Sequence, residues 1–384
     1  MKVWLQNPFD NLPLEGYRKM RYWMMAEAFV RAGHDVTLWT ASFNHGTKAP
    51  RRIAGAPDGF ALRLYAAPPY ARNVSFARIR SHRAAAAAWE RDAVAALSTS
   101  GAPDLIVTSS PTLSGAEAAL RLGKRMGAKV VVDIQDDWPG TFERLAPRGL
   151  RGFFRLALAP LRRRARTIYR AADLVTGVCD RYRTLCGRAD YFRAYLGIEG
   201  GAAVPPRPAD GNVRLVYAGN LGRSYDLGTV FKGLSILREE GMSVTLDVAG
   251  KSDGALPAEG DVVCRGYLGE RDLRTLLATC DIGIVPMSDD SCVGVPNKFA
   301  DYAEAGLCIL SSLGGESAAL LAQSGAGVTY RAGDPKSFAA AVRDLAGRRA
   351  ACGRAARELY ERTFGATAIY DGYVRRLEDL ACAR

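Results

Sequence analysis

The sequence predicts an α/β protein built from two doubly wound domains in tandem. Three observations indicate this: short apolar runs alternate with amphipathic segments, the alternation stops once and restarts, and 384 residues are enough for two domains of ordinary size. Hydrophobic residues make up 48% of the chain and charged residues 24%, which is typical of a globular protein. No run of eighteen apolar residues occurs, so we expect no membrane-spanning helix.

The first half follows the β-α-β order of a parallel sheet that is covered on both faces. Residues 2–6 are a short apolar strand. Residues 18–33 carry apolar side chains at helical spacing and end in a glycine, and residues 34–40 predict the next strand. Further along, DLIVTSS, SGAEAALRLGKRMG and KVVVDI indicate a strand, a helix and a strand.

The alternation stops at residues 198–212, which are rich in Gly, Pro and Ala and lack periodicity. It restarts with VRLVYAG and continues through strand-like and helix-like segments to KSFAAAVRDLAGR. We therefore expect an N-terminal domain at residues 1–200, a linker at 201–212 and a second domain at 213–365. Two such domains can face a central cleft with the carboxyl ends of their strands, where doubly wound folds bind ligands.

The positive charge is concentrated in one half of the chain. Residues 1–200 contain 31 Lys+Arg and 17 Asp+Glu (+14), whereas residues 201–384 contain 21 and 23 (−2), which together give +12. The first half is expected to meet an anionic nucleic acid, membrane surface or phosphorylated substrate. Nucleic acid is disfavoured because stacking platforms and recognised binding motifs are missing. Eight cysteines without a CxxC pair indicate a reducing cytoplasm, and three scattered histidines disfavour a metal site.

The segment VPNKFADYAEAG predicts an anion site at the start of a helix. Pro296 suits a first helical turn, and Asn297, Lys298 and Asp301 are spaced to share one side of it. Backbone amides, the helix dipole and the Lys298 ammonium would attract phosphate, while a carboxylate one turn later can accept hydrogen bonds from sugar hydroxyls. The arrangement fits a ribose diphosphate. A capped helix with a solvated Lys–Asp pair is the alternative.

Two further segments of the first half carry candidate site residues. In NPFDNLPLEGYRKMRYW, Gly16 lets the backbone approach a ligand, and the following helix can offer amides to phosphate; Arg18 lies beside it or is merely solvated. In DIQDDWPGTF, Asp136 and Asp137 follow a strand and can orient an acceptor hydroxyl. Capping of the next segment is the alternative for this acidic pair.

The segment RGLRGFFRLALAPLRRRARTIYRAA interleaves arginines with apolar residues. It predicts two amphipathic helices around Pro160. Such a surface can lie on anionic lipid headgroups, with Arg162, Arg163 and Arg164 as the candidate contacts. The chain would then be cytoplasmic and peripheral on the inner membrane face; an ordinary solvated helix face is the alternative.

The order of motifs along most of the chain resembles the family 4 glycosyltransferases of the GT-B fold. The resemblance rests on PNKFADYAEAG with CILSS, on VYAGNLGRSYDLGTVFKGLSIL, on RGYLGERDLRTLLATCDIGIVPM, and on VTSSPTLSGAEAALRLGKRMGAKVVVDIQDDWPGTFERL. The branch that builds bacterial surface polysaccharides is the most similar. The resemblance implies two Rossmann-like domains that face a central cleft, and a last helix at 366–384 that returns to the N-terminal domain.

The resemblance also implies roles for individual residues. Asp301 would hold the donor ribose, Lys298 would touch the diphosphate, and Arg223 would be the second cation in GNLGRS. Asp136 matches the family's acidic residue before Trp-Pro and would be catalytic together with Lys298 and Arg223. The remaining donor-binding residues implied are Gly16, Gly222, Arg265, Tyr267 and Asn297, and those on the acceptor side are Arg18 and Asp137.

We therefore expect a retaining glycosyltransferase of the hexosyltransferase type. It would move a sugar from a nucleotide-diphosphate sugar, UDP rather than GDP, to a lipid diphosphate-linked sugar, without a dedicated metal or other cofactor. A soluble small-molecule acceptor is the alternative within this class. From other classes, a GT-B nucleotide-sugar epimerase would need an acid/base set that the scarcity of histidine disfavours, and a non-catalytic nucleotide-sugar binder would show no turnover.

Overall fold

The computed structural model describes most of the chain, namely residues 1–201, 210–219, 222, 225–250, 261–289, 291 and 293–382. It divides into two compact units. Unit 1 comprises Met1–Tyr195 together with Ala366–Arg384, and unit 2 comprises Leu196–Gly365. The C-terminal helix is thus part of the first unit. Residues 202–209 of the expected linker lie outside the described residues.

Unit 1 contains a seven-stranded parallel sheet with the strand order β5-β2-β1-β6-β7-β8-β9. Its strands are β1 (Lys2–Gln6), β2 (Asp35–Ala41), β5 (Ala61–Tyr65), β6 (Leu105–Ser110), β7 (Lys129–Ile134), β8 (Leu174–Gly177) and β9 (Phe192–Arg193). A short antiparallel pair stands apart from this sheet, formed by β3 (Phe43–Asn44) and β4 (Ala49–Pro50).

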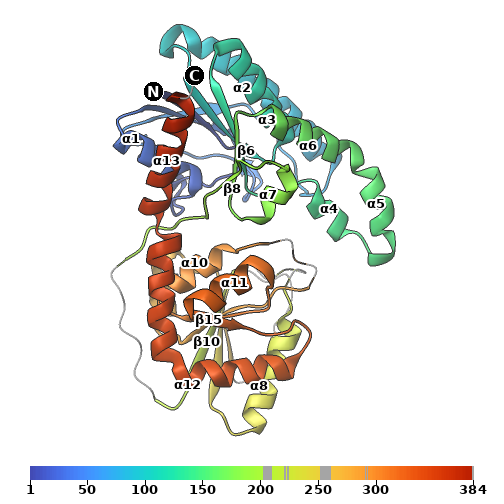
Figure 1. The fold of residues 1–384 in the computed structure, drawn as a ribbon, viewed down its shortest axis with the longest axis vertical. Helices are drawn as coiled ribbons and strands as arrows, with labels where there is room; N and C mark the ends of the chain where they lie inside the picture. Colours follow the sequence, from blue (N-terminus) through green and yellow to red (C-terminus); the bar gives the residue numbers. More distant parts are fainter. Residues whose placement is uncertain are drawn as a thin grey trace. The chain divides into compact units, whose positions relative to one another are not determined.

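Helices cover both faces of the unit 1 sheet (Figure 1). One face packs against α1 (Arg21–Arg31) and α13 (Ala366–Cys382), and the other against α2 (Phe76–Ser100) and α3 (Leu113–Met126). The two cores alternate along each strand: Val3 and Leu5 face α1, whereas Trp4 faces α2 and α3. The remaining helical elements are η1 (Pro13–Glu15), α4 (Gly140–Leu145), η2 (Arg148–Leu150), α5 (Arg151–Ala157), α6 (Ala159–Ala171) and α7 (Arg181–Cys186).

Unit 2 contains a six-stranded parallel sheet with the order β12-β11-β10-β13-β14-β15. Its strands are β10 (Val213–Ala218), β11 (Val244–Ala249), β12 (Val262–Gly266), β13 (Ile282–Val285), β14 (Cys308–Ser311) and β15 (Gly327–Thr329). Its helical elements are α8 (Leu227–Glu239), α9 (Glu270–Leu277), α10 (Asn297–Glu304), α11 (Gly315–Ser324), α12 (Pro335–Leu359) and η3 (Tyr360–Phe364).

The predicted α/β class with two doubly wound domains is confirmed. The two amphipathic helices predicted around Pro160 are also present as α5 and α6, with Pro160 in the first turn of α6. The elements that the sequence did not predict include strands β5, β8 and β9 of unit 1, and α11 and β15 of unit 2. In both sheets all strands run parallel, so the carboxyl ends of the strands gather at one edge, where the candidate site residues lie.

Candidate functional site

Helix α10 is fixed to the sheet of unit 2 by Tyr302. The Tyr302 hydroxyl accepts a hydrogen bond from the backbone amide of Ala218 (2.8 Å) and lies 3.2 Å from the carbonyl oxygen of Ile284, to which it donates. Its ring lies over Gly283, where a Cβ atom would come within 2.3 Å of the ring. Any larger residue in place of Gly283 would therefore displace the helix. The contacts hold the first turn of α10 at the carboxyl edge of the sheet.

Lys298 points from this first turn into an aromatic enclosure. Its side chain is 7% exposed, and its Nζ lies 4.1 Å from the ring centre of Tyr217 and 4.4 Å from that of Tyr225. Within the described part of the chain, the ammonium has no hydrogen-bond partner. Gly219 borders the enclosure with φ of 138° and leaves space that a Cβ atom would fill at 3.3 Å from Nζ. A buried ammonium with no hydrogen-bond partner among the described residues is unusual and is suited to a ligand.

Burial sets the protonation of Lys298. Desolvation lowers the pKa of its ammonium from 10.5 to about 7, and the nearby carboxylate of Asp301 counteracts part of this shift. The two ring faces also favour the cation. An anion placed at the start of α10 would add both charge and hydrogen-bond acceptors, and the helix N-terminus attracts the same kind of ligand. The arrangement is therefore chemically suited to a phosphate or diphosphate.

Asn297, Lys298 and Asp301, which the sequence predicted to share one side of the helix, differ in exposure. Asn297 is exposed, Lys298 is buried, and Asp301 is half-buried. The side chain of Lys298 turns inward because Tyr217 and Tyr225 receive it. Asp301 still lies close enough to affect the pKa of Lys298. The interpretation as a capped helix with a solvated Lys–Asp pair is wrong, since the lysine is not solvated.

The other donor-binding candidates of unit 2 are placed differently. Arg265 donates to the buried carboxylate of Asp247 at 2.6 Å, so its guanidinium is held on β11, whereas Tyr267 is exposed. Gly222 precedes Tyr225, whose amide donates to the Gly222 carbonyl oxygen at 3.1 Å. Arg223 lies outside the described residues.

The acidic pair of unit 1 divides into a buried and an accessible carboxylate. Asp137 is 6% exposed, and its carbonyl oxygen accepts from the amide of Thr141 at the start of α4. Asp136 reaches solvent and accepts from the Thr141 hydroxyl at 3.3 Å. The surrounding protein nevertheless removes water from the Asp136 carboxylate, and this desolvation raises its pKa. Asp136 is thus the member of the pair that can meet a substrate.

Two histidines, His45 and His82, lie at this edge, although the sequence gave histidine no role here. His82 comes from α2, and its ring centre lies 5.8 Å from that of Trp138, which follows the acidic pair. His45 accepts from the Tyr70 hydroxyl at 2.5 Å. Desolvation lowers the pKa of His45 to about 4 and that of His82 to about 3, so both rings are neutral at physiological pH. No local motif marks either residue, because the fold brings them together from distant segments.

The loop before α1 holds Gly16 in the left-handed region (φ 82°), where it ends η1, with open space around its Cα. Arg18 is half-buried in the same loop. The helix that follows is already capped: the amide of Tyr22 donates to the carboxylate of Asp10 at 3.0 Å. This carboxylate disfavours a phosphate at the start of α1. Burial raises the pKa of Asp10 to about 6.

The three arginines expected to contact a membrane have different surroundings. Arg162 pairs with Glu143, and Arg164 pairs with Glu117 through two of its nitrogens. Arg163 is exposed. The two paired side chains hold α6 against α4 and α3, so only Arg163 of the three is available to a surface.

Family models match both units. A glycosyl transferase 4-like domain matches residues 20–195, and a domain of the glycosyl transferases group 1 matches residues 212–348, so that together they span most of the chain. The chain is a family 4-like glycosyltransferase with the GT-B fold. Its donor-site candidate Lys298 lies in the group 1 domain, and Asp136 lies in the 4-like domain.

Solved glycosyltransferases share the fold of this glycosyltransferase. Sucrose-phosphate synthase from Thermosynechococcus elongatus is 13% identical with a TM-score of 0.76, and the match covers 100% of both chains. Anabaena HepE in complex with UDP and glucose is 13% identical with a TM-score of 0.62 over 98% of this chain and 99% of that chain. The lipopolysaccharide outer core galactosyltransferase WaaB is 13% identical with a TM-score of 0.63 over 99% and 100%. No curated protein sequence matches the chain.

The described residues contain no group of three or more His, Cys, Asp or Glu side chains arranged to hold a metal ion. No helix among them has both the length and the apolar character needed to cross a bilayer.

Proposed function

We propose that this glycosyltransferase moves a hexose from a UDP-sugar to a hydroxyl of a lipid diphosphate-linked sugar, with retention of anomeric configuration, in bacterial surface polysaccharide assembly. The single observation that carries the proposal is Lys298: a buried ammonium without a described partner, at the start of a helix and at the carboxyl edge of the group 1 domain. UDP is favoured as the carrier because Anabaena HepE, which shares the fold, was solved with UDP-glucose.

In this proposal Lys298 stabilises the leaving group. The bond between the sugar C1 and the diphosphate oxygen breaks, a bond from C1 to the acceptor oxygen forms, and UDP leaves with the bonding electrons while the acceptor hydroxyl loses its proton. The protonated Lys298 and the α10 dipole offset the negative charge that develops on the diphosphate. Asp301, on the next turn, would bind the ribose hydroxyls, and Asp136 would orient the acceptor hydroxyl.

The proposal also places the enzyme at an anionic membrane surface. Three large apolar side chains of η2 and α5 are exposed: Leu150 by 52%, Phe153 by 69% and Leu156 by 76%. Beside them, a hollow of about 370 Å³ is lined by Leu156 and by four arginines: Arg155 and Arg162, which both pair with Glu143, and Arg163 and Arg166. Exposed apolar side chains next to arginines suit an interface of acyl chains and anionic headgroups.

The donor half of the proposal is tested by calorimetry with UDP, GDP and UDP-glucose, each with and without EDTA. We expect UDP and UDP-glucose to bind and EDTA to leave their affinities unchanged, because the protein supplies the cation. Failure of all three nucleotides to bind would contradict the donor site. Binding that vanishes with EDTA would contradict the metal-independent mechanism.

Turnover and membrane binding are tested separately. Release of UDP that depends on an added lipid-linked acceptor is expected; donor binding without any turnover would instead favour a non-catalytic binder. For the membrane, Phe153→Ser with Leu156→Ser should reduce co-sedimentation with phosphatidylglycerol vesicles. Leu64→Ser, which changes another exposed leucine of unit 1, serves as the matched control. Equal sedimentation of both variants would favour a soluble acceptor.

A further inference from the structure

The loop that leads into α2 carries an exposed apolar tip, formed by Val74, Phe76 and Ile79. Their side chains are exposed by 64%, 90% and 40%. Val74 and Phe76 flank Ser75, which caps the start of α2. Phe76 and Ile79 are three residues apart and therefore share one side of the helix. Neighbouring large apolar side chains that are exposed together indicate an interaction surface.

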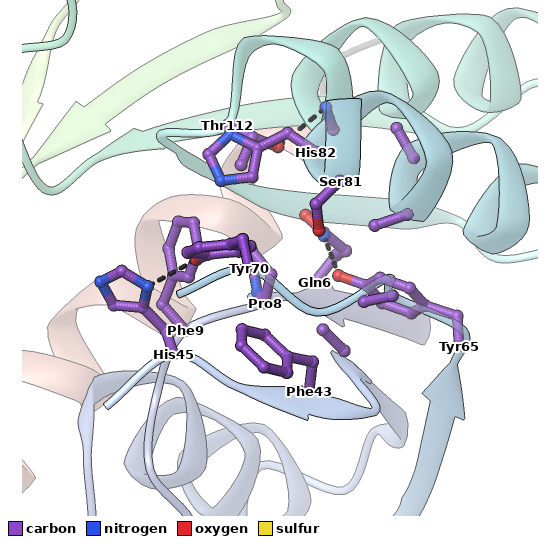
Figure 2. Close-up of a pocket in the computed structure, with 15 residues that line it drawn as sticks. Gln6, Pro8, Phe9, Phe43, His45, Tyr65, Tyr70, Ser81, His82 and Thr112 are labelled. Atoms are coloured by element: carbon purple, nitrogen blue, oxygen red, sulfur yellow. Dashed lines mark hydrogen bonds between the residues drawn. The ribbon is translucent and has the colours of Figure 1, made fainter. Parts of the chain in front are cut away.

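Buried groups of unit 1 hold this loop in place. Tyr70 is 6% exposed, and Figure 2 shows it lining a small pocket together with His45 and His82. The Tyr70 hydroxyl donates to Nδ1 of His45 at 2.5 Å. Ser81, in the second turn of α2, donates to the carbonyl oxygen of Pro68 at 2.6 Å. The loop is thus fixed at Pro68 and Tyr70, just before the tip begins.

Polar bonds next to the tip fix its backbone as well. The Ser75 hydroxyl accepts from the backbone amide of Arg78 at 3.2 Å. The carbonyl oxygen of Asn73 accepts from the Arg78 guanidinium at 2.8 Å. Arg78 thereby holds the residues on both sides of Val74. The apolar side chains of the tip are therefore carried by a backbone that unit 1 itself positions.

The tip is accompanied by positive charge that no described carboxylate neutralises. Arg72, Arg80 and Arg83 are exposed, and none of them forms an ion pair with a carboxylate in the described part of the chain. Residues 59–89 contain five arginines and no Asp or Glu. The next acidic residue, Glu90, pairs with a different arginine. The surface around the tip is therefore complementary to an anionic partner.

Ring and charge contacts connect this tip with the apolar side chains on η2 and α5. The Arg78 guanidinium lies 5.6 Å from the ring centre of Trp138, and that ring centre lies 4.9 Å from the one of Phe142 in α4. Glu143 of α4 pairs with Arg155 of α5 at 3.0 Å. Helices α2 and α4 follow the carboxyl ends of β5 and β7, two strands of one parallel sheet, so both surfaces extend from the same edge.

We propose that this tip is a second point at which unit 1 contacts an anionic lipid bilayer. The inference rests on the proposed function for the choice of a membrane as the partner, and it adds a contact that is separate from α5. A bilayer presents anionic phosphates directly beside an apolar layer, which matches arginines around an apolar tip. Val74 and Phe76 enter between the headgroups and the acyl chains, while the three arginines lie at the level of the phosphates. Two contacts on one framework restrict how unit 1 turns on the surface and hold its carboxyl edge, with Asp136, toward the headgroups.

Insertion of the tip is tested on the full chain with Phe76→Trp and phosphatidylglycerol vesicles that are brominated on their acyl chains. The fluorescence of the added indole is the difference from the wild type, which has five tryptophans. It should shift to shorter wavelength with ordinary vesicles and be quenched by the brominated ones. Val263→Trp, at an exposed valine of unit 2, should show neither effect. Fluorescence of Phe76→Trp that brominated lipid leaves unchanged would overturn the inference.

Co-sedimentation with phosphatidylglycerol vesicles measures the apolar contribution. Val74→Ser with Phe76→Ser should lower the partition coefficient by about tenfold or more, because burial of a phenylalanine side chain is lost. Ala77→Ser, at an exposed position in the same turn, should bind like the wild type. Equal partition coefficients for the double variant and the wild type would overturn the inference.

The same assay measures the charge contribution. Arg80→Gln and Arg83→Gln should each lower the partition coefficient by about fivefold on phosphatidylglycerol vesicles. Arg91→Gln is the matched control on the same helix, because Arg91 lies 3.5 Å from the carboxylate of Asp92, and it should bind like the wild type. If both Arg80→Gln and Arg83→Gln also bind like the wild type, the tip does not meet anionic lipid.

Two further comparisons separate this inference from the proposed function. If Phe153→Ser with Leu156→Ser binds vesicles like the wild type while the Val74 and Phe76 double variant does not, the contact on α5 is wrong and the tip stands. Calorimetry should show that UDP binds to the tip variants as it does to the wild type. If UDP binds to none of these proteins while the vesicle results are as expected, the donor proposal is wrong and the membrane contact stands.

Discussion

Each unit buries a cation in the first turn of a helix, between two tyrosine rings, but the two cations have opposite surroundings. In unit 1, Arg21 is 2% exposed and lies 5.8 Å and 5.5 Å from the ring centres of Tyr370 and Tyr373. It forms two 2.9 Å bonds with the carboxylate of Asp133. In unit 2, Lys298 lies closer to its two rings, at 4.1 Å and 4.4 Å, and has no described hydrogen-bond partner.

The difference separates a structural cation from one available to a ligand. The Asp133 carboxylate holds the pKa of Arg21 well above its ordinary value, although burial acts in the opposite direction. Burial alone dominates at Lys298 and lowers its pKa to about 7. A buried charge without a partner is costly, so a protein retains it where a ligand completes it. Arg21 has its partners within the fold, whereas for Lys298 we propose that a bound diphosphate is the partner.

The largest expected effect is on the stability of unit 1. Arg21→Met leaves Asp133, which is fully buried, without its cation and should lower the free energy of unfolding by about 3–5 kcal/mol. Arg31→Met is the matched control on the same helix, since its pair with Asp371 is exposed and contributes about 1 kcal/mol or less. Urea unfolding followed by tryptophan fluorescence measures both. Equal losses would show that Arg21 is no more structural than a surface arginine.

The next largest effect is on donor binding. Lys298→Met removes the ammonium that the proposal assigns to the diphosphate. It should lower the affinity for UDP by about 100-fold, because a charge-assisted contact in a site shielded from water is lost. Lys336→Met, an exposed lysine of unit 2, should bind UDP normally. Calorimetric affinities for both variants decide the matter. Normal UDP binding by Lys298→Met would contradict its role.

The same substitution should stabilise the protein without ligand. Methionine has a similar length and carries no charge to desolvate, so Lys298→Met should raise the free energy of unfolding by about 1–2 kcal/mol near pH 7. The gain should shrink toward pH 10, where Lys298 is neutral in the folded state and becomes neutral in the unfolded state as well. A loss of stability at pH 7 would mean that the fold itself needs the ammonium.

The smallest expected effect concerns the rings. Tyr225→Leu removes one of the two ring faces that favour protonated Lys298. It should lower the affinity for UDP by about threefold to fivefold. Tyr225→Phe keeps the ring and should bind like the wild type. If the Tyr225→Phe variant binds UDP as weakly as Tyr225→Leu, the Tyr225 hydroxyl rather than its ring face supports UDP binding.

Local patterns in the sequence were sufficient for the central strands of the two sheets and for the position of Lys298. Strand and helix periodicities are local, and so is the proline-led start of α10. The enclosure around Lys298 was not predictable in the same way, because Tyr217 lies in β10, far earlier in the sequence, and nothing in VRLVYAG indicates that its ring receives a lysine.

Long-range contacts also explain the other places where the structure differs from the sequence predictions. Arg162, Arg163 and Arg164 are adjacent in sequence, yet Glu143 and Glu117 come from other helices and take up two of them. The histidines of the pocket in unit 1 come from segments that precede the acidic pair by more than fifty residues. Their meeting at one sheet edge follows from the parallel topology, while their side-chain contacts depend on packing that no periodicity encodes.

Proton uptake on UDP binding tests the central claim most directly. The pKa of Lys298 lies near 7 without ligand, and a bound diphosphate favours its charged form, so between pH 7 and 10 binding should take up a proton. The affinity should then fall by about tenfold for each pH unit above 7. Calorimetry at pH 8.5 in buffers of different ionisation enthalpy should give an uptake approaching one proton for the wild type and none for Lys298→Met. A wild-type affinity that is independent of pH, with no proton taken up, would contradict the account.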